Sequence, residues 1–135
     1  MKNLILTVFT FCAFTFSFAQ SNTSKEDKIQ LKKNSVEVSD YISDELKLED
    51  KKKAIVANAF AEYGNNISKL NDKLTAKSNM TDEEKNKMTF EKMAEFTKLR
   101  DSKISRILDD KQIDKYKKLS THFDPMSLTM KKKKK

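Results

Sequence analysis

The clearest pattern in the chain is a stripe of apolar residues that recur at alternating steps of four and three positions. This spacing marks one face of an α-helix, and its regular alternation is typical of a coiled coil. The stripe comprises Val56, Phe60, Tyr63, Ile67, Leu70 and Leu74. Gly64, the only glycine, lies within it and marks a place where the helix can bend. Because the helix has one apolar face, it must pack against another element.

Three further segments show helical periodicity. The stretch VEVSDYISDELKL predicts a short helix before the long one. Its apolar positions are Val38, Tyr41, Ile42 and Leu46. A third helix follows the loop TAKSNM, with a stripe that comprises Met88, Met93, Phe96, Leu99, Ile104 and Ile107. The last helix carries Ile113, Tyr116 and Leu119, and it ends before Pro125, which cannot continue a helix.

Two of the predicted helices begin with the sequence of a capping box, in which the first residue and the one three positions later bond each other's backbone amide. Thr81 and Glu84 form one such pair. Asp109 and Gln112 form the other. These pairs fix where the third and fourth helices start.

Composition points to the same fold class. Charged residues make up 36% of the 135 positions, and glycine and proline occur once each. This suits long exposed helices and excludes all-β folds and glycine-rich nucleotide-binding loops. We therefore predict an all-α protein of three to four helices in an extended or curved hairpin. A single layer of three or four helices is thin and leaves an apolar stripe uncovered. We therefore expect a homodimer.

The first residues, MKNLILTVFTFCAFTFSFAQ, have the organisation of an export signal. Lys2 precedes an apolar run that is shorter than the roughly 20 residues that span a bilayer, and Ser17 and Ala19 form a small-x-small cleavage site. Cys12, the only cysteine, lies inside this signal, so the exported chain has no disulfide. We expect a periplasmic protein, or alternatively a secreted or surface-associated one.

The remaining chain divides by composition into three parts. After the signal peptide, residues 1–19, the polar and aperiodic residues 20–34 are expected to be a disordered leader. Residues 35–124 form the predicted helical domain. Residues 125–135 are expected to be a disordered basic tail.

The sequence offers little for catalysis, so we expect no enzyme and no cofactor. His122 is the only histidine and is expected at the surface or at a helix end. The acidic groups Asp82–Glu84 and Asp109–Asp110 lie in first helical turns, where acids complement the helix dipole. A zinc or copper site needs several histidines or cysteines, so we expect no metal.

The segment around the second capping box follows the frame Arg100-x3-Ile104-x2-Ile107-Leu108-x3-Gln112-x3-Tyr116, with Asp109 directly after Leu108. This frame resembles the Spy/CpxP-type LTxxQ-motif family, small exported helical proteins of the bacterial periplasm. Leu108 and Gln112 match the family's Leu-Thr-x-x-Gln motif, and Asp109 keeps a capping oxygen where the family has threonine. The resemblance covers about residues 38–123.

The stretch LKLEDKK is similar to an earlier copy of the motif, although only Leu48 matches. Glu49 and Lys52 stand where the family has threonine and glutamine. The resemblance implies a curved all-helical hairpin, often an antiparallel dimer, whose concave face shields unfolded clients without ATP. The family also contains metal-responsive and envelope-stress regulatory members.

The third helix is rich in soft apolar side chains, which adapt well to irregular partners. We predict a client-binding face that comprises Met80, Met88, Phe90, Met93 and Phe96. Phe90 is expected to be exposed, because at about 100° per residue it lies about 160° from Met88. Arg100, within the same stripe, is expected to attract acidic unfolded segments. The alternative interpretation is that this face packs against Phe60, Tyr63 and Ile67.

The chain carries a formal charge of +8, and most of the excess lies in a terminal run of lysines. The run comprises Lys131, Lys132, Lys133, Lys134 and Lys135. Such a run attracts anionic lipid or an acidic envelope polymer, whereas an exported protein does not meet nucleic acid in vivo. The alternative is a solvated end that only aids solubility, or an artificial addition.

These features together predict an exported, chaperone-like protein that binds unfolded or partly folded clients without ATP during envelope stress. The alternative is a structural or adaptor protein at the envelope surface, whose cationic tail contacts anionic lipid or polymer.

Overall fold

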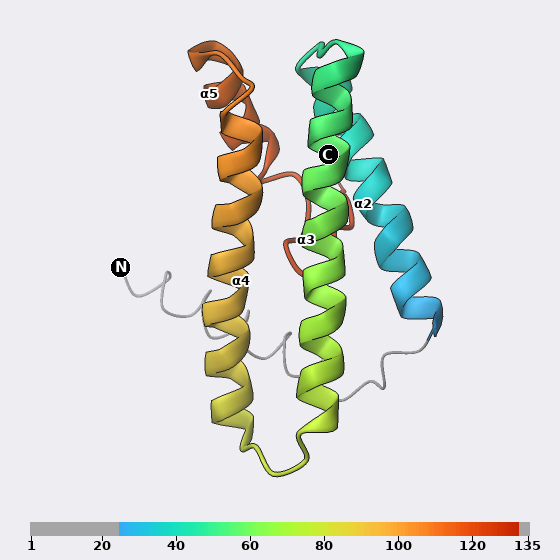
Figure 1. Cartoon of the computed structure of the whole chain (residues 1–135), viewed down its shortest axis with the longest axis vertical. Coiled ribbons are helices and arrows are strands. Elements are labelled where there is room, and N and C mark those ends of the chain that lie inside the picture. Colours follow the sequence, from blue (N-terminus) through green and yellow to red (C-terminus); the bar gives the residue numbers. More distant parts are fainter. Residues whose placement is uncertain (1–24, 133–135) are drawn as a thin grey trace.

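The predicted all-α class is confirmed: a computed structural model describes residues 25–132, which contain four α-helices and no strand (Figure 1). Residues 1–24 and 133–135 lie outside the described part, and with them the expected export signal and the last three lysines. The helices pack as antiparallel hairpins and are α2 (Lys25–Glu45), α3 (Asp50–Ala76), α4 (Asp82–Ser105) and α5 (Asp110–Leu119).

Helix α3 lies at the centre, between α2 and α4, and packs against both (Figure 1). All six residues of its predicted apolar stripe are buried, so this helix forms as predicted. The lower ends of α3 and α4 extend beyond α2 and α5 in Figure 1. That part of the molecule is therefore a two-helix hairpin.

Both predicted capping boxes are present. The Glu84 amide donates to Thr81 Oγ1 at 3.2 Å, and the Thr81 amide donates to Glu84 Oε2 at 2.9 Å. The Gln112 amide donates to Asp109 Oδ1 at 2.8 Å, and the Asp109 amide donates to Gln112 Oε1 at 3.1 Å. These bonds satisfy amides that a helix start leaves without a partner.

The expected disordered leader is wrong for residues 25–34, because α2 begins at Lys25. The buried positions in the first half of this helix are polar, so hydrophobic periodicity does not reveal it. Asn34 is buried and its Nδ2 donates to the Ser127 carbonyl at 2.9 Å. Ser35 lies beside Gly64 of α3, where an added Cβ would be 3.6 Å from the Cβ of Ser35.

The expected disordered tail is wrong for residues 125–130, which belong to the fold. We call residues 121–130 the C-terminal strap. It turns at Asp124, whose Oδ1 accepts from the amides of Met126 and Ser127 at 2.9 Å each, and it returns through an isolated bridge between Phe123 and Met130. Leu128, at φ 55°, is fully buried in the core.

The core lies between the three long helices and the strap, which passes behind α3 in Figure 1. The ring centroids of Phe60 and Phe123 are 5.6 Å apart in an edge-to-face arrangement. The predicted stripe of α4 is only partly correct, since Ile104 is buried but Leu99 is 46% exposed. Leu99 lies at the edge of the stripe, beside a small cavity that residues of α3 also line.

Candidate functional site

The residues of the LTxxQ-like frame gather where α4 turns into α5. Ile104, Leu108 and Tyr116 are buried in the core, and Ile107 packs against it. Gln112 completes the capping box, and its Nε2 also donates to the Leu46 carbonyl at the end of α2, at 3.4 Å. The frame therefore acts as a structural junction that fixes α5 to the corner between α2 and α3.

Arg100 occupies the centre of this junction and is 5% exposed. Its guanidinium carbon lies 4.6 Å from the ring centroid of Tyr63, 5.3 Å from that of Phe60 and 5.4 Å from that of Phe123. At such distances the negative faces of aromatic rings attract a cation. The expectation that Arg100 attracts acidic segments from the surface is wrong, because the side chain is enclosed by the core.

One carboxylate oxygen compensates the buried charge. Asp101 Oδ1 accepts from Arg100 Nε at 3.0 Å and from Arg100 Nη2 at 2.9 Å. The same oxygen accepts from the Tyr116 hydroxyl at 2.7 Å. Arg100 Nη1 has no hydrogen-bond partner within the described residues. Beside Arg100 is a cavity of about 10 Å³, close to the size of one water molecule.

The protonation states of this cluster follow from burial and from the pair of charges. Burial raises the pKa of the Tyr116 phenol well above its usual range, and the positive charge of Arg100 opposes this only in part. Burial also raises the pKa of Tyr63. For Arg100, burial works against the charged form, but Tyr116, Asp101 and Tyr63 outweigh it and raise the pKa further. The cluster therefore holds a permanent cation among neutral phenols.

A hydrogen bond joins the strap to the cluster of aromatic rings around Arg100. The Tyr63 hydroxyl donates to the Pro125 carbonyl at 2.7 Å. Tyr63 also contacts the Arg100 guanidinium, so the strap and α4 meet on the same aromatic ring. Sequence reasoning missed this contact, since nothing in the spacing of residues links positions 63 and 125.

The predicted client-binding residues divide into two groups. Met93 and Phe96 pack against the core, as the alternative interpretation holds for them. Met80 and Met88 are partly exposed, and Phe90 is 78% exposed. The expectation that Phe90 is exposed is confirmed. Only Phe90 presents most of its side chain to solvent.

Those of the remaining predicted residues that the structure describes are exposed. Lys131 and Lys132 are exposed, and the Lys131 amide donates to the His122 carbonyl at 2.7 Å. Lys133, Lys134 and Lys135 lie outside the described residues. His122 is exposed, and its Nδ1 lies 2.9 Å from the Tyr41 hydroxyl.

Two features are absent from residues 25–132. No group of three or more histidine, cysteine, aspartate or glutamate side chains is placed to hold a metal ion in this range. None of the helices in it is long and apolar enough to cross a membrane.

Comparison of the chain with models of known protein families, with curated proteins and with solved structures found no match. The resemblance to the LTxxQ-motif family therefore stays a prediction drawn from the frame around Leu108 and Gln112.

Proposed function

We propose that the protein is an exported, chaperone-like binding protein that holds unfolded or partly folded segments of other proteins without ATP. The observation that carries this proposal is the position of Phe90. It is 78% exposed, in the first half of α4. A large exposed aromatic side chain favours contact with apolar segments.

The surroundings of Phe90 support an adaptable contact. Met80 and Met88, on the same hairpin, keep part of their surface in solvent, and methionine adjusts its shape to irregular partners. Met93 and Phe96 instead pack inward and hold the hairpin to the core. The client surface that we propose is thus smaller than the predicted face.

The proposal is tested by the aggregation of reduced lysozyme, followed by light scattering. The wild-type protein is expected to suppress the scattering without ATP, and Phe90→Ser is expected to need up to about tenfold more protein for the same effect, because it removes one aromatic contact. Lys87→Ser, one turn away and also exposed, is the matched control. A wild-type protein that suppresses nothing at several-fold molar excess contradicts the proposal.

We also propose that the protein self-associates, since the two-helix hairpin leaves Phe90 without cover from its own chain. Sedimentation velocity at tens of micromolar measures this directly. A folded monomer at that concentration contradicts self-association and leaves the client-binding proposal unaffected.

A further inference from the structure

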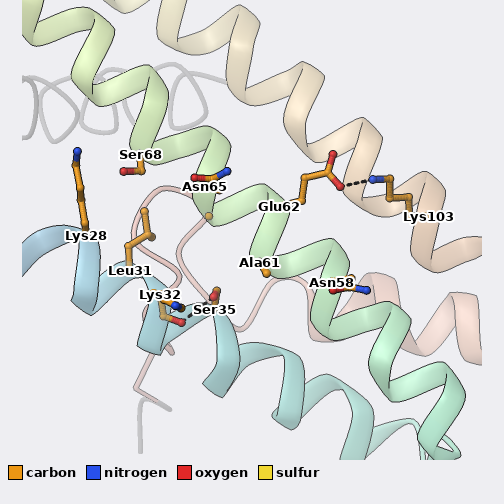
Figure 2. A pocket seen from close by; sticks show the side chains of 11 residues that line it. Lys28, Leu31, Lys32, Ser35, Asn58, Ala61, Glu62, Asn65, Ser68 and Lys103 are labelled. Atoms are coloured by element: carbon orange, nitrogen blue, oxygen red, sulfur yellow. Dashed lines mark hydrogen bonds and ion pairs between the residues drawn. The ribbon is translucent and has the colours of Figure 1, made fainter.

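A groove runs across the face of α3 that is opposite the strap. Between α2 and α3 it forms a hollow of about 790 Å³, within the size range of ligand and peptide pockets. Figure 2 shows lysines of α2 on one side and small or amide side chains of α3, such as Ala61 and Asn65, along the floor. Because the floor side chains are short, a partner can approach the α3 backbone closely.

The groove continues past α3 to α4. A second hollow of about 300 Å³ lies between α3 and α4, and it shares Asn58, Glu62 and Lys103 with the first. The ion pair between Glu62 and Lys103 joins the two helices at this point (Figure 2). The two hollows therefore form one continuous surface that spans the three long helices.

The charges that line this groove are mostly positive. Four cations, Lys28, Lys32, Lys103 and Arg106, face a single lining carboxylate, Glu62. Lys28 is paired with Asp72 and Lys103 with Glu62. Lys32 and Arg106, one at each end of the groove, have no ion pair within the described part of the chain. These two cations are available to a partner.

Apolar side chains accompany the two free cations. On α2, Ile29 is 55% exposed and Val36 is 53% exposed. They lie three residues before and four residues after Lys32, and so share its stripe of the helix. At the other end, Ile55 is 39% exposed and lines the same hollow as Arg106. Exposed aliphatic surface therefore lies beside Lys32 on α2, next to the residues that line the groove, and beside Arg106 within the groove itself.

We propose that this groove binds an acidic, amphipathic peptide segment of a partner protein. An excess of positive charge repels a second copy of the same face, so the partner must carry negative charge. The hollow shape suits a peptide rather than the plane of a bilayer. Phe90 does not line the groove, so this site is separate from the proposed client surface.

A labelled 18-residue peptide, with leucines at helical three- and four-residue steps and glutamates elsewhere, is the probe for fluorescence anisotropy. We expect the double variant Lys32→Glu with Arg106→Glu to weaken binding about tenfold, because it removes two exposed cations and places two carboxylates that repel the peptide. Lys117→Glu with Lys118→Glu, on exposed residues of α5, makes the same charge change away from the groove and is expected to bind like wild type. Ala61→Trp fills the floor and is expected to weaken binding without unfolding the helix.

Three outcomes would overturn the proposal. The first is equal binding of a matched peptide with lysines in place of glutamates. The second is an equal loss in the α5 control, which would show unspecific attraction by net charge. In the third, the double variant no longer binds vesicles of three parts phosphatidylcholine and one part phosphatidylglycerol but still binds the peptide. That result would show that the groove contacts lipid. The lysozyme assay tests the client surface at Phe90, so its outcome does not decide whether the groove binds the peptide.

Discussion

The Tyr116 hydroxyl donates a hydrogen bond of 2.7 Å to Asp101, and the same carboxylate oxygen holds the buried guanidinium of Arg100. The Tyr116 phenol of α5 thus stabilises the Asp101 carboxylate of α4, which is paired with Arg100. This contact connects two helices that meet in a tight corner, and it makes the position of α5 depend on the buried cation.

Removing the Tyr116 hydroxyl should therefore destabilise the fold. We expect Tyr116→Phe to lower the free energy of unfolding by about 1 to 1.5 kcal/mol, which is typical of a hydrogen bond to a charged group that keeps some access to water. Urea denaturation followed by circular dichroism measures the change. Tyr41→Phe is the control, since its hydroxyl shares a hydrogen bond with the exposed His122, and its effect should be smaller. Equal effects of the two variants would contradict a special role for Tyr116.

The same tyrosine predicts a dependence of stability on alkaline pH. Its pKa is raised in the folded protein by burial, so the folded state favours the neutral phenol. The stability from this preference is complete below the unfolded pKa of about 10 and is lost as the pH rises above that value. Between pH 9 and pH 11, wild type should lose more stability than Tyr116→Phe. Parallel urea midpoints across this range would contradict the prediction.

Gly64 offers a stabilising substitution. An added Cβ would lie 3.6 Å from the Cβ of Ser35 and 3.9 Å from Cδ1 of Leu128, which are ordinary contact distances. Because alanine is favoured over glycine inside a helix, Gly64→Ala should raise the free energy of unfolding by about 0.5 to 1 kcal/mol. Thermal denaturation checks this. A lower melting temperature would contradict the prediction, because these distances leave room for the methyl group.

The capping box of α5 should contribute measurably to stability. Asp109→Ala removes the acceptor of the Gln112 amide and is expected to cost about 0.5 to 2 kcal/mol. Asp110→Ala is the matched control, because it removes the neighbouring acid without removing a cap. Chemical denaturation of both variants separates the cap from the general effect of an acid in the first turn. An unchanged midpoint for Asp109→Ala would contradict the prediction.

The lysine tail is proposed to contact anionic surfaces independently of the helical body. The Lys131 amide bonds to His122, so a deletion of Lys132–Lys135 spares the last contact of the strap. We expect this deletion to abolish salt-sensitive binding to anionic vesicles, because each lysine near a charged surface contributes at most about 1 kcal/mol to that binding. The helical circular dichroism should stay unchanged. Vesicle binding that persists with the same salt dependence would place the responsible charge on the helices.

Sequence patterns were sufficient for the parts of the fold that rest on apolar periodicity or on capping chemistry. The stripe of α3 and both capping boxes follow from residue spacing alone, and so does the exposure of Phe90. The first half of α2 was missed because its buried positions are the polar residues Asn34 and Ser35, which pack against the strap and beside Gly64.

The aromatic cluster and the groove were beyond sequence reasoning for a related reason. The sequence predicted Arg100 to be a surface cation. Its burial could not be foreseen, because the three rings around it come from α3 and from the strap. The groove depends on Lys28 and Lys32, which fall in the segment expected to lack structure. Both features arise from contacts between distant segments, and no local pattern encodes such contacts.

The strap also has a consequence for the biogenesis of the protein. Phe123 and Leu128 fill the core beside Phe60, so the apolar centre closes only after nearly the whole chain has left the ribosome. Contacts this distant in sequence form late, since a long loop must close before they contribute. If the protein is exported as we propose, an export apparatus that threads unfolded chains would meet a nascent protein that lacks its native centre, and folding would finish on the far side of the membrane.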